Sequence, residues 1–403
     1  MGQTDFSSHK ALLIEDMAEA RIMQKKMLTD FGFQSVDIAM KAETAIDLLK
    51  TQSFDLILSD YNLGNGKDGQ QLLEEVRHSE LIPNTTTYLM VTAETSIEMV
   101  MGAIEFQPDG YITKPFSQAL LQRRLSKLLA MKAKLKQVNL ALDKKDFARA
   151  IEEAYLVIAA HPSLEGKCLR TIGECYIEMQ EYAQAKEVFS SVLKTRKMPW
   201  AVFGEARACF YLNHLEQSEA KFRQLMLDNR FFVSAYDWLA KIKIAQKDHV
   251  AAQAILVDAI ERSPKNLLRQ MELGKLSMII KDYQTSELAF RRAVSLAKHS
   301  CYNTADIYLK HLSTFAKLSE QGPLSSRYKE SFQSTLKKIH QLFFDDPAVR
   351  AQTYSYETDI YLNSNDANNA KNTLQLWVRD VESGIALAPT NQQNTQYKLA
   401  LES

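Results

Sequence analysis

The chain has 403 residues, enough for two or three domains of ordinary size. Its 49 basic and 49 acidic side chains balance, which argues against a nucleic-acid-binding protein, usually basic in at least one domain. No apolar run approaches the length of a membrane-spanning helix, and we expect no secretory signal in the first residues. The four cysteines form no CxxC pair, so free thiols in a cytoplasmic protein are expected.

Strand-like and helical patterns alternate up to about residue 130. The expected strands are 11–14, 36–39, 56–60, 88–91 and 110–113, and the expected helices are 18–31, 42–51, 70–78 and 96–104. Such alternation is typical of a doubly wound α/β fold with a parallel sheet. We therefore predict a five-stranded parallel sheet, flavodoxin-like in its winding, as the first domain.

Polar side chains stand where these strands end. Glu15 and Asp16 follow the first strand, Asp60 ends the third, Thr92 follows the fourth and Lys114 follows the fifth. The carboxyl ends of parallel strands are where open sheets bind their ligands. Three carboxylates together call for a hard cation such as Mg²⁺, and a nearby lysine and hydroxyl complement a phosphoryl group. The set fits phosphoryl transfer to a carboxylate nucleophile, with the strand-end aspartate attacking.

These residues, with the run from 111 to 116, resemble the receiver domain of bacterial two-component response regulators over residues 8 to about 130. The resemblance implies that Asp60 is the phospho-acceptor. It also implies that the metal site consists of Glu15, Asp16, Asp60 and the backbone carbonyl of Asn62. The phosphoryl-binding and switch residues that it implies are Thr92, Tyr111, Lys114 and Pro115, with Pro115 after a cis peptide bond.

The loop after the acceptor departs from the family's usual pattern. Gly64 stands where most members have a proline, and Gly69 comes one residue later than usual. The acceptor chemistry is unaffected, but the conformation of the loop is left open. The two positions that tune the lifetime of the phosphoryl group in the family are Asn62 and Glu94 here, as in the fast-turning chemotaxis receivers. We therefore expect a short-lived aspartyl phosphate.

The junction after the first domain has no helix-breaking residue. Neither glycine nor proline interrupts residues 117 to 145, and leucines recur there at helical spacing. The pattern predicts one continuous helix of roughly 40 Å. Its lysines and arginines are interpreted as a solvated face. We therefore expect the first domain, residues 1–130, to move as one body with the domain that follows.

From residue 131 to residue 403 the strand signals vanish and a repeat takes over. Small residues recur at intervals of 35, 33, 34 and 34 residues, at Ala150, Ala185, Ser218, Ala252 and Ser286. The pattern resembles the tetratricopeptide repeat, a pair of antiparallel helices that stacks into an all-α solenoid. We expect about five clear repeats over 132–300, irregular structure over 301–330 and two weaker repeats over 331–390. The C-terminal tail is expected to be either a capping helix or disordered.

Solenoids of this kind present a concave surface built from the first helix of each repeat. The family's register places there Trp200, Phe203, Arg207, Phe210, Tyr211, Lys241, Met271 and Lys275. Aromatic residues, methionine and arginine are enriched at protein interfaces, so the groove is expected to bind a helix or an extended peptide with scattered acids. The chain's own last repeats, or a second copy in a homodimer, are the alternative occupants.

Together these patterns predict a response regulator, not an enzyme, whose output is protein binding. A sensor histidine kinase or phosphotransfer protein would phosphorylate Asp60 with Mg²⁺ as cofactor, and the switch would modulate the solenoid's grip on an unidentified partner. The alternatives are a constitutive adaptor with a non-signalling receiver and a transcriptional regulator that acts through a bound protein. No helix-turn-helix unit, phosphate loop or nucleophile elbow stands out after residue 130, so direct nucleic-acid binding and catalysis are not expected, nor is membrane binding.

Overall fold

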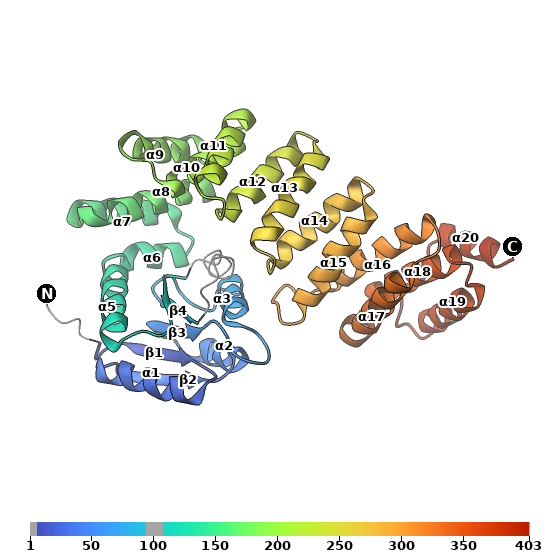
Figure 1. Cartoon of the computed structure of the whole chain (residues 1–403), viewed down its shortest axis with the longest axis horizontal. Helices are drawn as coiled ribbons and strands as arrows, with labels where there is room; N and C mark the ends of the chain where they lie inside the picture. The colour runs from blue at the N-terminus through green and yellow to red at the C-terminus, as the bar shows by residue number, and fades with distance from the viewer. Residues whose placement is uncertain (1–5, 94–107, 403) are drawn as a thin grey trace. The chain divides into compact units, whose positions relative to one another are not determined.

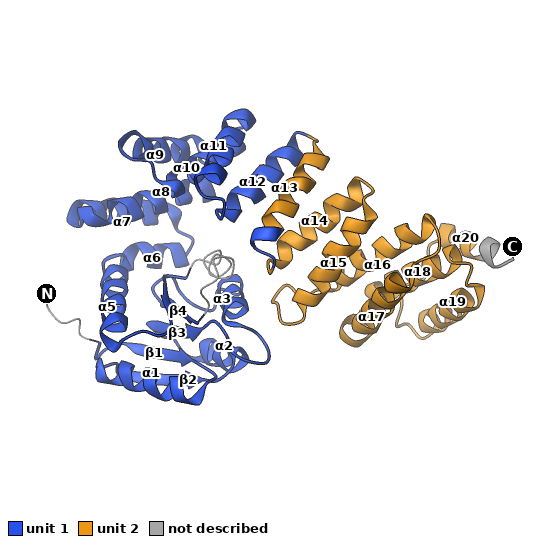
Figure 2. Ribbon diagram, in the orientation of Figure 1, with its two compact units in different colours: residues 1–246, 261–264 blue, residues 247–260, 265–403 orange. Residues whose placement is uncertain are grey.

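The computed structural model describes residues 6–93 and 108–402, with side chains described as far as residue 397. The chain divides into two compact units (Figure 2). Unit 1 consists of residues 1–246 and 261–264, and unit 2 of residues 247–260 and 265–403. Each unit has hydrophobic cores of its own. Among the helices that the structure describes, none is both long and apolar enough to span a membrane.

Unit 1 begins with a five-stranded parallel sheet in the order β2-β1-β3-β4-β5. The strands are β1 Lys10–Ile14, β2 Ser35–Ala39, β3 Leu56–Asp60, β4 Thr87–Thr92 and β5 Gly110–Thr113. The three central strands are buried along nearly their whole length because helices cover both faces. The predicted parallel sheet is confirmed, and each strand end lies within one residue of the prediction.

Helices pack on the two faces of this sheet (Figure 1). They are α1 Ala18–Asp30, α2 Ala42–Thr51, α3 Gly69–His78 and α5 Gln118–Lys134. Successive strand side chains point to opposite faces. Leu13 and Leu58 therefore pack with α1 and α5, whereas Leu12 and Ile57 pack with α2 and α3. The helix expected over 96–104 falls outside the described residues.

The junction consists of two helices, so the prediction of one continuous helix is wrong. α5 ends at Lys134, and α6 runs from Lys136 to Asp143 at an angle to it (Figure 1). Leu135 between them has φ −91° and ψ 9°, outside the helical region. Its side chain is 3% exposed and packs with Val138 in a hydrophobic core made by residues from 135 to 175. We term this core that of the first helical repeat. Burial of this leucine favours a turn at a position where the sequence has neither glycine nor proline.

The rest of unit 1 is built from antiparallel helix pairs. The helices are α6, α7 Phe147–Ala160, α8 Glu165–Glu178, α9 Tyr182–Thr195, α10 Pro199–Tyr211, α11 Leu215–Asp228 and α12 Val233–Ala245. The turn inside each pair contains a residue with left-handed backbone, namely Lys145 (φ 56°), Gln180 (φ 61°) and Asn213 (φ 60°). Five positions after each comes a fully buried small residue, Ala150, Ala185 and Ser218. The same turn and the same close contact therefore return with the period found in the sequence.

Glycines let neighbouring helices approach an aromatic ring closely. A Cβ added at Gly173 on α8 or at Gly204 on α10 would lie 2.4 Å from Cζ of Phe189. In unit 2, a Cβ at Gly274 would lie 2.6 Å from Cε1 of Phe290. Since real Cβ contacts do not come this close, only glycine fits at these positions without a shift of the ring or the helix.

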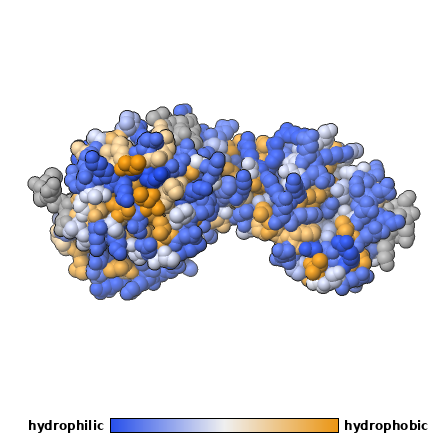
Figure 3. Space-filling view, turned by 90° about the horizontal axis from the view of Figure 1, so that it is seen from below, coloured by the Kyte–Doolittle hydropathy of each residue, from blue (hydrophilic) through white to orange (hydrophobic). Residues whose placement is uncertain are grey.

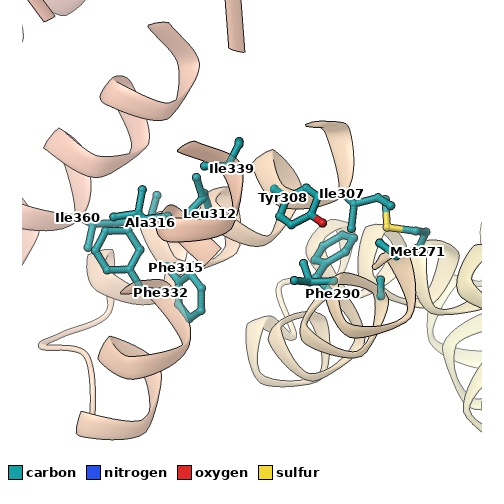
Figure 4. Packing of buried hydrophobic residues seen from close by; sticks show 14 of the residues in the cluster. Met271, Phe290, Ile307, Tyr308, Leu312, Phe315, Ala316, Phe332, Ile339 and Ile360 are labelled. Atoms are coloured by element: carbon teal, nitrogen blue, oxygen red, sulfur yellow. The ribbon is translucent and has the colours of Figure 1, made fainter. Parts of the chain in front are cut away.

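Unit 2 is also helical. It contains most of α13 His249–Arg262, then α14 Leu267–Ile279, α15 Tyr283–Ala297, α16 Ala305–Glu320, α17 Ser326–Phe343, α18 Pro347–Asn363, α19 Ala367–Glu382 and α20 Asn391–Glu402. Helix α16 corrects the expectation of irregular structure over 301–330. Its Tyr308, Leu312 and Phe315 lie in the core of the unit (Figure 4), while nearby serines and the Gly322-Pro323 pair had suggested a loop.

Candidate functional site

Three carboxylates meet at the carboxyl edge of the sheet. Glu15 follows β1 and Asp60 ends β3; both are buried, whereas Asp16 is at least partly exposed. Oxygen atoms from the three residues all lie within 4.8 Å of one another. The structure thus brings together the acids that the sequence placed at two separate strand ends.

Lys114, directly after β5, bridges two of these acids. Its Nζ donates to Oε2 of Glu15 and to Oδ2 of Asp60, each at 2.9 Å. Burial acts to lower the pKa of Lys114, but these two carboxylates outweigh it and the pKa lies above its usual value. Burial raises the pKa of Asp60 to about 6, and the charge of Glu15 acts in the same direction, while Lys114 opposes both.

Two residues of α1 hold the acidic pair in place. Nε2 of Gln24, whose side chain is buried, donates to Oε2 of Glu15 at 2.8 Å. The Arg21 guanidinium donates to the backbone carbonyls of Glu15 at 3.1 Å and Asp16 at 2.9 Å. The sequence interpretation missed both residues. The available signal was a pair of polar side chains three residues apart on the helix that follows the acids.

The loop after Asp60 is held against the acids by two glycines. The N–H of Gly69 donates to the carbonyl of Tyr61 at 2.7 Å, and a Cβ at Gly69 would lie 2.1 Å from the carbonyl oxygen of Asp60. Gly64 has φ +72°, and a Cβ there would lie 2.9 Å from Oδ2 of Asp16. The left-handed backbone at Gly64 is a conformation that glycine adopts readily and other residues rarely do. The loop therefore fits closely around the acceptor.

The predicted switch residues lie on the last two described strands. Thr92 ends β4, is buried, and pairs in register with Thr113 of β5. Tyr111 on β5 is half-buried against the core under α2 and α3. The peptide bond before Pro115 is cis. Their functional roles stay predictions.

The two positions predicted to tune the phosphoryl lifetime differ in what can be said of them. Asn62 is exposed, and its Oδ1 accepts from the backbone N–H of Gly64 at 3.2 Å. Glu94 lies outside the described residues. A short-lived aspartyl phosphate therefore stays a prediction.

The acidic cluster fits a hard divalent cation. Carboxylate oxygens are preferred ligands of Mg²⁺. Three carboxylates converge here, only two of them bonded to Lys114, and repulsion from Glu15 contributes to the raised pKa of Asp60. A cation would relieve that repulsion. Glu15, Asp16 and Asp60 are accordingly the side chains that would hold it.

In unit 1 the candidate partner surface centres on Trp238, which the projected register left out. Phe210 and Tyr211 meet this ring edge-on, at 5.4 and 5.6 Å between centroids, and the Arg207 guanidinium lies 5.5 Å and the Lys241 ammonium 4.3 Å from its centroid. Arg207 also forms an ion pair with a carboxylate of α8. Partly exposed aromatic and cationic side chains therefore do gather here.

The other members of the predicted groove behave differently. Trp200 meets Phe189 edge-on at 6.3 Å, and Phe203 packs against Phe222 at 5.6 Å, so both contribute to packing between helices. In unit 2, Lys275 is exposed. Met271, however, is 6% exposed and lies in the core beside Phe290 (Figure 4). Its assignment to the partner surface is corrected, because the register placed it on the first helix without showing which way it points.

Comparisons with known proteins agree with this geometry. The sequence model of the response regulator receiver domain matches residues 11–126. The chain is 34% identical over 119 residues to chemotaxis protein CheY-3 of Vibrio cholerae serotype O1, an alignment covering 30% of this chain and 90% of that protein. It is 32% identical to chemotaxis protein CheY of Pseudomonas aeruginosa, covering 30% and 94%. The chain belongs to the response regulator receiver family.

The family assignment applies to the α/β part, which contains the matched residues 11–126 and which we term the receiver. A solved CheY-like receiver domain from Methanospirillum hungatei JF-1 is 26% identical and spans 32% of this chain and 98% of its own, with a TM-score of 0.29. Receivers are signalling modules of phosphorelays, and a histidine kinase or phosphotransfer protein is the partner that this class implies. The helices from α6 onward lie outside the matched residues.

Proposed function

We propose that this chain is a response regulator in which Asp60 accepts a phosphoryl group from a sensor histidine kinase or phosphotransfer protein. The observation that carries the proposal is the convergence of Glu15, Asp16 and Asp60 with Lys114 at the carboxyl edge of the sheet. Residues 1–130 form the receiver, and residues 131–403 form a solenoid that binds a protein partner.

The transfer converts the Asp60 carboxylate into an acyl phosphate. A bond forms between a carboxylate oxygen and phosphorus while the phosphorus–nitrogen bond of the donor's phosphohistidine breaks, and the imidazole leaves with that electron pair. Lys114, which bonds to Asp60 here, is positioned to hold an oxygen of the product. The three acids and the carbonyl of Asn62 would hold Mg²⁺, which would supply positive charge for the phosphoryl oxygens. Thr92 and Tyr111 then act as the switch.

An apolar rim beside the acids supports docking of the donor protein. Met17, Ile22, Met23 and Met40 lie on α1 and just after β1 and β2, and are between 46% and 70% exposed. Figure 3 views the receiver from the side of α1 and β2 and shows apolar surface among hydrophilic surface. Exposed apolar patches on a folded protein commonly mark interaction sites. A helical donor that covers this rim would bring its phosphohistidine to Asp60.

The geometry of the helix pairs supports a tetratricopeptide-repeat solenoid. Left-handed turn residues recur in unit 1 at Lys145, Gln180 and Asn213, which are 35 and 33 residues apart, and in unit 2 at Lys247 and Lys281, which are 34 apart. Asn365 (φ 57°) and the buried Ala370 repeat the same relation between α18 and α19. The surface around Trp238 supports protein binding as the output.

Labelling with acetyl phosphate and Mg²⁺, followed by intact mass and peptide mapping, tests the proposal. The chain should gain one phosphoryl group on Asp60, and Asp60→Asn should gain none. Asp55→Asn is a matched control, because this exposed aspartate precedes β3 and bonds to the backbone of Lys10, away from the acidic cluster. Failure of the unmodified chain to label, with either acetyl phosphate or a phosphorylated donor, would favour the constitutive adaptor instead. A phosphoprotein half-life of many hours would contradict the predicted short lifetime alone.

A further inference from the structure

A buried lysine stands at the sheet edge opposite the acceptor. Nζ of Lys132, near the end of α5, donates to Oδ1 of Asp109 at 2.8 Å and to the carbonyl of Asn84 at 2.6 Å. The Lys132 and Asp109 side chains are 10% and 11% exposed. Asp109 also accepts from the N–H of Tyr88 at 2.9 Å. Removing one member of a buried ion pair is costly, so this contact ties α5 firmly to the start of β4 and β5.

Asn84, in the loop between α3 and β4, is also bonded to α6. Oδ1 of Asp143, the last residue of α6, accepts from both the backbone N–H and the side-chain amide of Asn84, each at 2.8 Å. Asn84 therefore binds α5 through its carbonyl and α6 through its N–H groups. We term Asn84, Asp109, Lys132 and Asp143 the clasp.

Helix α5 belongs to two cores at once. Leu121, Leu125 and Leu129 are buried against the sheet, whereas Met131, and Leu135 directly after the helix, pack with α7 and α8. No free linker separates the two cores. A displacement of α5 or of the strand edge beneath it must be taken up by the helical repeat.

Strand β5 connects the clasp with the acceptor. Asp109 directly precedes the strand and Lys114 directly follows it, so the two are separated by a strand of about 13 Å. Lys114 bonds to Asp60, so a change of charge at Asp60 acts on one end of the strand whose other end carries Asp109.

Helix α6 carries a buried side-chain hydrogen-bond donor that the described structure does not satisfy. Asn139, one turn before Asp143, is 9% exposed, and its Nδ2 has no hydrogen-bond partner among the described residues. Leaving a buried donor unpaired is unfavourable. An arrangement of α6 that pairs this donor would gain that hydrogen bond, so a signal that reaches α6 can shift the balance between the two arrangements.

From these contacts we propose that the clasp transmits the state of Asp60 to α6 and the first helical repeat. Modification of Asp60 displaces Lys114 and β5, Asp109 moves with the strand, and Lys132 and Asn84 carry the change to the end of α5 and to α6. The inference rests on phosphorylation of Asp60 as proposed above, and it adds the route by which the signal leaves the receiver.

Hydrogen exchange on the full chain with Mg²⁺, with and without beryllofluoride as the phosphoryl analogue, tests the route. In the wild-type chain, beryllofluoride should change the protection of β3 and β5 and, further along, of α6 and α7. In Asp143→Ala, which removes an exposed side chain and leaves the receiver's own contacts in place, the change should be lost beyond Leu135. Asp109→Asn should give the same loss from the other end of the clasp.

Glu80→Gln is the matched control. It breaks the ion pair between Glu80 and Lys145, which joins the same two parts at 2.8 Å and whose side chains are 70% and 66% exposed. An exposed ion pair contributes little, and the variant leaves both hydrogen bonds from Asn84 to Asp143 and the Lys132 contacts in place, so the spread should persist. If the protection change still extends beyond Leu135 in both Asp143→Ala and Asp109→Asn, the proposal is overturned. If the protection change in the wild-type chain stops at α5, the proposal is also overturned, but the proposed function stays intact. No change even in β3 would reject the proposed function as well.

Discussion

Replacing the acceptor should stabilise the receiver when no divalent cation is present. Burial, with the charge of Glu15, raises the pKa of Asp60 from 3.8 to about 6. The folded protein therefore holds this proton more tightly than the unfolded chain does. By linkage, the free energy of unfolding falls as the pH rises from about 4 to about 6, and it stays at the lower level above pH 6. Asp60→Asn removes this ionisation altogether.

The size of the effect follows from the shift. About two pKa units correspond to roughly 3 kcal/mol. Asparagine also gives up the charged hydrogen bond from Lys114, which is worth about 1.5–3 kcal/mol as a single contact, although Glu15 continues to neutralise the lysine. Because Glu15 keeps the lysine neutralised, the loss lies at the lower end of that range, and we expect a net gain of about 1.5 kcal/mol above pH 6 that shrinks to zero or below as the pH falls towards 4.

Native-state hydrogen exchange of the β3 amides in the full chain measures this free energy. The variant and the unmodified chain are compared at the same pH, at several values from 4 to 8. Mg²⁺ should then stabilise the unmodified chain and have a much smaller effect on Asp60→Asn. Asp55→Asn, at the other end of β3, should match the unmodified chain both in its pH dependence and in its response to Mg²⁺. If Asp60→Asn were no more stable than the unmodified chain at pH 8 without Mg²⁺, the reasoning about the buried carboxylate would be refuted.

Three further predictions concern packing, charge and docking. Gly204→Ala should destabilise unit 1 by about 1–2 kcal/mol, because its Cβ would lie 2.4 Å from Phe189 and helix propensity offsets only part of the overpacking. Gly166→Ala, whose Cβ meets only the flexible end of Arg196 at 3.3 Å, should not, and chemical unfolding compares the two; equal losses would contradict the packing argument. Glu357→Gln should stabilise unit 2 at pH 8 but not at pH 4. Burial raises the pKa of Glu357 to about 7, so its charged form destabilises the fold at higher pH. Thermal melts that show the same difference between variant and wild type at both pH values would count against this prediction. Met23→Asp should slow phosphotransfer from a donor protein and leave acetyl phosphate labelling intact, and a parallel loss of both would place the effect at the acceptor instead.

The receiver was predictable because its signals are local. Each central strand is an apolar run that ends on a polar residue, and parallel strands bring their carboxyl ends to one edge. That logic alone places Glu15, Asp60 and Lys114 near one another, and the structure gives 2.9 Å for both bonds of Lys114. The period of the small buried residues likewise follows from helix pairs that return with one geometry.

Only the tertiary structure decided how the chain uses these elements. The break at Leu135 depends on burial of that side chain in a neighbouring core, and no local residue announces it. Met271 faces the core for the same kind of reason. Gln24 reaches Glu15, and Asp109 reaches Lys132, through contacts between elements that are separate in the sequence. Local sequence determined which elements form and which end of each strand carries chemistry; long-range packing determined where helices turn, which faces are buried and what lies at the opposite end of the sheet.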